Sequence, residues 1–213
     1  MKLETAQLRL ASCAGMAAVD LERQLRARVS ELPGVRHVAL GRNMTGSFGA
    51  GDYTLDLAFA DAPERSLAAT LRGLADVDSV VYRQIGGGQR DPVLRDGIWR
   101  TLMFRVRPQA SEQHVRALER DLLRMPDYMP GILNWRLARV ASADTWTHVW
   151  QQEFASVNDL LGEYLMHPFH WGWVDRWFDP ACPDWTVEAI SHAFCPLATS
   201  LIAGHAGKET RTS

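Results

Sequence analysis

The sequence Leu32-Pro33-Gly34-Val35, followed by Leu40-Gly41-Arg42, recurs as Met129-Pro130-Gly131-Ile132, followed by Leu137-Ala138-Arg139. Phe59-Ala60 recurs in the same way as Phe154-Ala155. The offset between the two copies is about 95–97 residues, which is the size of a small domain rather than of a solenoid repeat. The chain is therefore predicted to contain a tandem repeat of one structural unit.

Each half shows the periodicity of the same six elements. In the first half, strands are predicted at 7–13, 35–40, 53–59 and 79–85, and helices at 19–32 and 64–74. In the second half, strands are predicted at 99–106, 131–140, 146–154 and 185–194, and helices at 111–125 and 157–166. The order β-α-β-β-α-β is that of the ferredoxin-like fold. Because such a sheet is covered on one face only, we expect two α+β repeats to pack together as one barrel within the chain.

The boundary between the two units is predicted at Gly86-Gly87-Gly88-Gln89-Arg90-Asp91-Pro92, interpreted as a linker. All eight tryptophans follow residue 98, so composition changes at the same place. The predicted domains are a degenerate ferredoxin-like repeat at 1–88 and a second repeat at 96–198. Only the second repeat contains a segment at 167–184 that has no counterpart in the first.

The composition of the 213 residues is that of a globular protein, with 46% hydrophobic and 23% charged residues. The formal net charge is −2 and basic residues do not cluster, so neither nucleic acid nor a membrane is an expected partner. The three cysteines are predicted to be reduced, and residues 1–12 lack the apolar core of a signal peptide, which together indicate a cytoplasmic protein. A zinc site of Cys182, Cys195 and His192 does not have a usual ligand spacing, so we expect no metal.

The segment with the clearest chemistry is Tyr164-Leu165-Met166-His167-Pro168-Phe169-His170-Trp171-Gly172-Trp173. Pro168 suits the first turn of a helix, which would put His167 at the N-cap and His170 one turn inside. The helix dipole would then lower the pKa of His170 and keep its imidazole able to accept a proton. With Trp177, the tryptophans here indicate a pocket for a flat apolar ligand. The alternative is a buried helix with two ordinary hydrogen-bonded histidines.

Residues 99–196 resemble the stress responsive A/B barrel (Dabb) family of the dimeric α+β barrel superfamily. The resemblance rests on Met129-Pro130-Gly131-Ile132, Thr147-His148-Val149, Phe154-Ala155-Ser156 and above all the Tyr-x-x-His-Pro-x-His pattern at 164–170. Within the family, this half is most similar to plant polyketide cyclases of the type that makes olivetolic acid. The resemblance implies that His170 is a general base, that Tyr164 polarises the substrate, and that His148 lies in the same pocket. A histidine usual on the first strand is missing, and Arg100 or Thr101 stands there.

The predicted function is that of a cofactor-independent acid/base enzyme, of lyase or cyclase type, acting on an aromatic or polyketide-like small molecule. The candidate catalytic residues are His170, Tyr164 and His148, and the candidate substrate-binding residues are His167, Trp150, Trp171, Trp173, Trp177 and Arg100. Two alternatives stay open: a non-catalytic stress-responsive or assembly protein, and a haem-binding protein of the same superfamily. The expected assembly is a monomer with a pseudo-dimer barrel, or a homodimer.

Overall fold

The computed structural model of the protein describes residues 1–11, 17–61, 66–141 and 145–206. Cys13, one of the three cysteines predicted to be reduced, lies outside these ranges. Cys182 and Cys195 are free thiols. None of the helices in these ranges combines the length and the apolar character that crossing a membrane requires.

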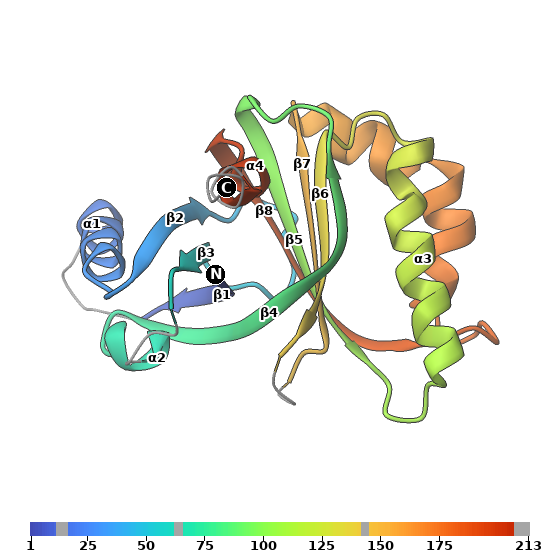
Figure 1. Ribbon diagram of the computed structural model, residues 1–213, viewed down its shortest axis with the longest axis horizontal. Coiled ribbons are helices and arrows are strands. Elements are labelled where there is room, and N and C mark those ends of the chain that lie inside the picture. Colours follow the sequence, from blue (N-terminus) through green and yellow to red (C-terminus); the bar gives the residue numbers. More distant parts are fainter. Residues whose placement is uncertain (12–16, 62–65, 142–144, 207–213) are drawn as a thin grey trace, which may run out of the picture.

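The chain forms one eight-stranded antiparallel sheet with helices on its outside (Figure 1). The first half consists of β1 (Lys2–Leu10), α1 (Ala18–Ser30), β2 (Val35–Arg42), β3 (Tyr53–Phe59), α2 (Leu67–Thr70) and β4 (Ala75–Gln89). The second half consists of β5 (Arg95–Val106), α3 (Glu112–Tyr128), β6 (Asn134–Val140), β7 (His148–Phe154), the short helical turns η1 (Asp159–Tyr164), η2 (His170–Val174) and η3 (Asp175–Trp177), β8 (Val187–Thr199) and α4 (Leu201–Ala206). The strand order is β2-β3-β1-β4-β6-β7-β5-β8.

The order β-α-β-β-α-β therefore runs twice along the chain. The edge strands β2 and β8 approach each other through the loop after β2, where Phe48 and His192 form a backbone bridge and Met44 N–H donates to Phe194 O at 2.9 Å. These contacts nearly close the sheet into a barrel. The predicted fold class, an α+β barrel of two ferredoxin-like units within one chain, is confirmed.

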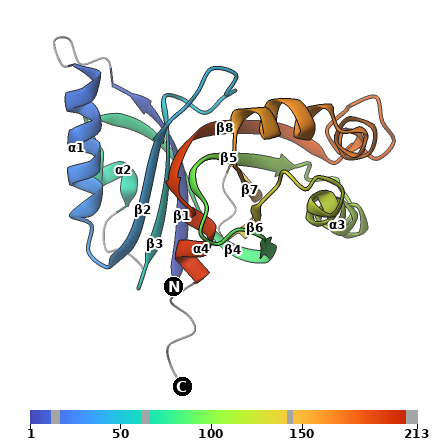
Figure 2. The same ribbon diagram turned by 90° about the horizontal axis from the view of Figure 1, so that it is seen from above.

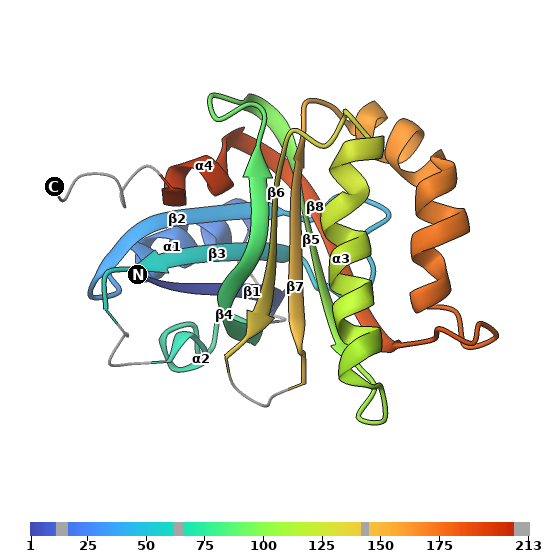
Figure 3. The same ribbon diagram turned by 45° about the vertical axis from the view of Figure 1, so that its right-hand side comes forward.

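The glycine stretch is not a linker, contrary to the prediction. It is the second half of β4, whose residues 75–82 pair with β1 and whose residues 82–89 pair with β6 (Figure 3). A Cβ atom on Gly87 would lie 2.6 Å from the backbone oxygen of Trp135, and one on Gly86 would lie 2.7 Å from the Leu123 side chain. Glycine is needed here because the neighbouring strand and α3 approach the backbone closely.

Helices α1 and α2 lie on one outer side of the molecule and α3 with the helical turns on the other, whereas α4 lies between the two halves of the sheet, next to β2 and β6 (Figure 2). Helices α1 and α2 cover the first half, and α3 with the helical turns covers the second half. The inner faces meet in a buried polar network around Asp56, which accepts hydrogen bonds from Tyr82 at 2.9 Å and Gln151 at 2.6 Å. Arg136 lies 3.6 Å from the same carboxylate. These side chains fill the space between the two halves of the sheet. The candidate site therefore lies on the other face of the second half, which α3 and the helical turns cover.

Several element boundaries differ from the prediction. Strand β1 begins at Lys2 rather than at residue 7, and it is buried continuously from Leu3 to Leu8. It lies between β3 and β4, so polar residues such as Thr5 are buried too and the expected alternation is absent. Within the described residues, α2 has only four residues, and β8 extends to Thr199 where pairing with β5 continues.

Candidate functional site

The helical segment 157–177 is interrupted at His167, where Pro168 starts a new helical turn as predicted. The Nδ1 atom of His167 accepts a hydrogen bond from the Phe169 N–H at 3.1 Å, and its backbone oxygen accepts one from the His170 N–H at 2.8 Å. His167 therefore caps the helix with its ring. Turns η1 and η2 on either side are π-helical, a conformation that occurs frequently at functional sites.

A cavity of about 220 Å³ lies between this segment and the second half of the sheet. Its polar lining comes from three strands and three helical turns: Arg100 on β5, Trp150 on β7, His192 on β8, Tyr164 on η1, His170 on η2 and Asp175 on η3. The remaining lining is apolar and consists of Leu102, Leu122, Leu160, Leu161, Leu165, Val174, Phe178, Ile190 and Phe194. Four predicted site residues, Arg100, Trp150, Tyr164 and His170, are thus brought to one cavity.

Tyr164 and His170 lie against each other in this cavity. Their ring centroids are 4.7 Å apart, and the rings meet edge to face at 62°. The Nδ1 atom of His170 is buried without a hydrogen-bond partner among the described residues, and the closest carboxylate oxygen to it is Oδ1 of Asp175 at 3.6 Å. The cavity therefore combines a phenol, an imidazole and a carboxylate.

Both rings are in the protonation state that proton transfer requires. Burial, the Arg100 charge and His167 lower the pKa of His170 to about 4, so its imidazole is neutral at pH 7. Burial raises the pKa of the Tyr164 phenol, against the opposing effect of Arg100, so the hydroxyl keeps its proton. The low pKa of His170 was expected from the helix dipole, but burial and neighbouring positive charge account for it here.

His148 does not converge on this cavity, contrary to the prediction. It lies under α3, where its Nε2 atom is 3.0 Å from Oε1 of Glu119 and its ring stacks on Phe104 at 4.7 Å. His148 shares a face of β7 with Trp150, but two residues along a strand span about 7 Å, so the two side chains reach different surroundings.

The first half has a contact at the matching position. The Tyr53 hydroxyl on β3 donates to Oε2 of Glu22 on α1 at 3.2 Å, as His148 on β7 contacts Glu119 on α3. The tandem duplication that this parallel suggests stays a prediction.

The tryptophans of the helical turns do not line the cavity either. The side chains of Trp171 and Trp173 are 60% and 42% exposed, and the Trp177 indole donates to Oδ2 of Asp121 at 3.0 Å. The prediction placed His170, Trp173 and Trp177 on one face by α-helical spacing. That spacing does not apply, because a π-helical turn followed by a 3₁₀ turn changes the rotation per residue.

Two polar residues of the cavity, Asp175 and His192, were not predicted as site residues from the sequence. Asp175 follows His170 by five residues, a spacing that has no meaning on an α-helix. His192 lies on β8, and burial together with the Arg100 charge lowers its pKa to about 4. A histidine next to apolar residues in the predicted strand 185–194 was the signal that could have drawn attention to it.

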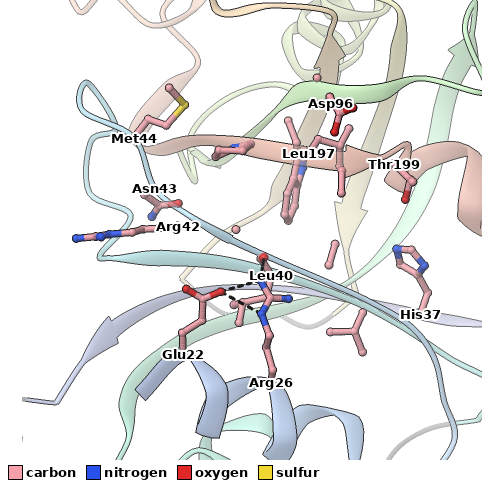
Figure 4. A pocket seen from close by; sticks show the side chains of 17 residues that line it. Glu22, Arg26, His37, Leu40, Arg42, Asn43, Met44, Asp96, Leu197 and Thr199 are labelled. Atoms are coloured by element: carbon pink, nitrogen blue, oxygen red, sulfur yellow. Dashed lines mark hydrogen bonds and ion pairs between the residues drawn. The ribbon is translucent and has the colours of Figure 1, made fainter. Parts of the chain in front are cut away.

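A second hollow lies at the seam of the barrel, between β2 and the end of β8 (Figure 4). This groove has a volume of about 670 Å³ and includes Glu22, Arg26, Arg42, Asp96 and Thr199. Glu22 and Arg26 form an ion pair at 2.8 Å, so these two opposite charges already satisfy each other. None of the residues predicted from the sequence lines the groove, and the smaller cavity is the better candidate.

Neither a metal nor haem fits the site well. In the described part of the chain, no three His, Cys, Asp or Glu side chains are placed to hold a metal ion, and this includes Cys182, Cys195 and His192. Cavities for drug-sized ligands measure about 300–1,000 Å³, and a haem macrocycle is larger than such a ligand. The cavity of about 220 Å³ is too small to enclose it.

Comparisons with known proteins agree with this architecture. Solved structures that resemble the chain include an anthrone oxidase-like protein (TM-score 0.55, 10% identity, covering 92% of this chain and 90% of that one). A major regulator of staphylococcal pathogenesis (TM-score 0.52, 10% identity, 92% and 98%) and a heme-degrading enzyme from Listeria monocytogenes (TM-score 0.50, 11% identity, 92% and 100%) are also similar. At these identities the likeness shows the fold alone. No curated protein matches the sequence. Residues 98–188 match the stress responsive A/B barrel domain family.

Proposed function

Because residues 98–188 form a stress responsive A/B barrel domain, we propose that the cavity binds a small organic molecule and catalyses proton transfer within it. His170 is the general base, and Tyr164 is the hydrogen-bond donor to the oxygen on which negative charge develops. This proposal rests on one observation: a neutral imidazole and a protonated phenol lie side by side in one small apolar cavity, with their ring centroids 4.7 Å apart.

The reaction we propose removes a proton from a carbon next to a carbonyl group. The proton passes to His170, and the electron pair of the C–H bond moves to the carbonyl oxygen, which accepts the hydrogen bond of Tyr164. The Asp175 carboxylate favours the tautomer in which Nδ1 of His170 carries a proton, which leaves Nε2 as the acceptor. A positioned base of this kind contributes roughly 10²–10⁴-fold to the rate.

The same step begins either a cyclisation or an elimination. If the enolate attacks a second carbonyl of the ligand, a ring closes. If a leaving group is adjacent, a carbon–carbon or carbon–heteroatom bond breaks instead. The side chains of the cavity support both outcomes, so the assignment to a cyclase or a lyase depends on the ligand.

Hydrogen–deuterium exchange tests the proton transfer without knowledge of the natural substrate. The protein would be incubated in D₂O with 4-acetylbenzoate or acetophenone, and the loss of the methyl signal would be followed by ¹H NMR. We expect exchange above background for the unchanged protein and background exchange for His170→Ala. His114→Ala is the matched control, because His114 lies on α3 outside the cavity. Equal exchange by the unchanged protein and His170→Ala would refute the proposal.

A further inference from the structure

Arg100 is a buried cation without a carboxylate partner. Its exposed fraction is 7%, and its Nη1 atom donates one hydrogen bond, at 2.8 Å, to the neutral amide of Gln152. No Asp or Glu of the described residues forms an ion pair with it. By contrast, the buried Arg136 is 3.6 Å from Asp56, and Arg176 is 2.9 Å from Asp121. Since arginine does not lose its proton in proteins, a buried guanidinium needs an acceptor to offset its desolvation.

Two further hydrogen-bond donors next to Arg100 are not matched by a charged acceptor. The Nε1 atom of Trp150 and the Nε2 atom of Gln152 are fully buried and form no hydrogen bond of ordinary geometry with a described residue, and their neighbouring acceptor is the neutral Tyr164 hydroxyl. Arg100 pairs with Gln152 across β5 and β7, and Leu102 pairs with Trp150 in the same ladder. The donors are thus neighbours on one face of the sheet, at the wall of the cavity that Arg100 and Trp150 line. This wall offers N–H groups and positive charge, and its own acceptor, the amide oxygen of Gln152, is neutral and already accepts from Arg100.

We propose that this wall binds the carboxylate of a small ligand, with Arg100 as its counter-ion and Trp150 and Gln152 as additional donors. The inference rests on the proposed function, because it names the substrate class of the same cavity. A guanidinium matches a carboxylate with two parallel N–H···O bonds. A dry cavity of about 150 Å³ accommodates benzene, so one of about 220 Å³ has room for a single ring with a carboxylate and a short substituent.

The charges around the cavity support this assignment. Burial is the larger cause of the low pKa values of His170 and His192, and the positive charge of Arg100 lowers them further. The same charge opposes the rise that burial causes in the pKa values of Tyr164 and Asp175. The field of the guanidinium therefore extends over the whole polar lining. A bound carboxylate would offset this charge and raise the pKa of His170 above about 4, while burial, the larger cause, keeps it below the ordinary value of 6.5; the imidazole becomes a stronger base. The ligand would then activate the base that acts on it.

Calorimetric titration with benzoate and its neutral analogue benzamide tests the inference. We expect the unchanged protein to bind benzoate at least about tenfold more tightly than benzamide, as one charge-assisted contact provides. Arg100→Met should lose this preference, and Arg100→Lys should keep part of it. Arg107→Met is the control, since Arg107 stacks on Trp185 outside the cavity. Acetate should bind more weakly than benzoate, because it leaves the apolar lining uncovered.

A second measurement does not depend on affinity alone. At about pH 5.5, benzoate binding to the unchanged protein should take up protons, as the pKa of His170 rises, and the uptake should vanish in Arg100→Met. Titrations in buffers of different ionisation enthalpy measure it. Equal affinity for benzoate and benzamide, or no binding of either at millimolar concentration, would overturn the inference. A preference for benzoate together with His170-independent exchange of 4-acetylbenzoate would instead leave the carboxylate site standing and refute the proposed proton transfer.

Discussion

The Nδ1 atom of His170, the first residue of η2, lies 3.6 Å from the Oδ1 atom of Asp175, which directly follows η2 and begins η3. In an α-helix, five residues correspond to a rotation of about 500°, so the two side chains would point about 140° apart. The i→i+5 hydrogen bonding of η2 brings them to the same side instead. The π-helical turn therefore produces the contact between the candidate base and the group that orients it.

Asp175→Asn should lower turnover by roughly tenfold to a hundredfold with little change in KM, because Asp175 positions the imidazole and does not react itself. Steady-state kinetics on any substrate found by the exchange assay would measure the two constants. Asp179→Asn, on the loop beyond the cavity, is the matched control. A rise in KM with unchanged kcat would show that Asp175 binds the ligand rather than positions the base.

The pH profile of kcat/KM should rise through about pH 4 and stay level at neutral pH, because the base acts when His170 is deprotonated. Burial raises the pKa of Tyr164 above its ordinary value of 10, so the decline at high pH should begin only beyond that value. In Arg100→Met, the rising limb should move to higher pH, since the positive charge that lowers the His170 pKa is gone. A limb that stays in place would mean that another group is the base.

Ligand binding should change the fluorescence of Trp150, which lines the cavity, and not that of the exposed Trp173. Trp150→Phe should abolish most of the quenching by a bound aromatic ligand, whereas Trp173→Phe should retain it. Fluorescence titration of the two variants measures the difference. Loss of the response in Trp173→Phe alone would place the ligand on the outer surface of the helical turns.

The hydrogen bonds that Glu119 receives from His148 and Arg139 should make stability depend on acid. Burial alone would raise the pKa of Glu119, but hydrogen bonds from His148 and Arg139 lower it from 4.5 to about 2. Because this pKa is lower in the folded protein than in the unfolded chain, Glu119 stabilises the fold at every pH above 4.5, by on the order of 3 kcal/mol. This stabilisation is lost as the pH falls from 4.5 to 2.

Urea denaturation between pH 2 and 7 would measure this dependence in Glu119→Gln, which should be less stable at neutral pH and less sensitive to acid. Glu112→Gln is the control, because Glu112 also contacts Arg139 but lies at the surface. An acid response of Glu119→Gln identical to that of the unchanged protein would contradict the assignment.

Gly87→Ala should destabilise the protein by about 1–3 kcal/mol, since its Cβ atom would meet the backbone oxygen of Trp135 at 2.6 Å. Thermal unfolding would measure the change. Gly162→Ala is the matched control: nothing lies within 4 Å of its added Cβ atom, and alanine is favoured in a helical segment. A neutral effect of Gly87→Ala would indicate that β4 does not continue past Gln84 in solution.

The sequence alone determined the element order and the position of the candidate base. Alternation of apolar residues located β3, Tyr53–Phe59, at its observed bounds, and Ser111 is the N-cap of α3 through its hydroxyl. Pro168 located the helix start, because a residue without an N–H group fits only the first turn. These features depend on local chemistry, which neighbours along the chain specify.

Tertiary structure decided which of the candidate residues share a cavity. His148 and Trp150 lie on the same face of one strand, yet α3 covers the first and the cavity opens over the second. The position of α3 depends on packing between elements distant in the sequence, which no local pattern encodes. The glycine stretch was misassigned for the same reason, because the contact with Trp135 that requires glycine comes from another strand.

The unpaired charge of Arg100 is likewise a property of the folded chain. The sequence shows an arginine on a strand, and most arginines there reach solvent or a carboxylate. Only the assembled sheet places Gln152 opposite it, while the Asp175 carboxylate feels its charge without forming an ion pair with it. The sequence therefore determined the fold and the pair Tyr164–His170, whereas the charge that distinguishes this cavity arises from how β5, β7 and the π-helical turn pack against one another.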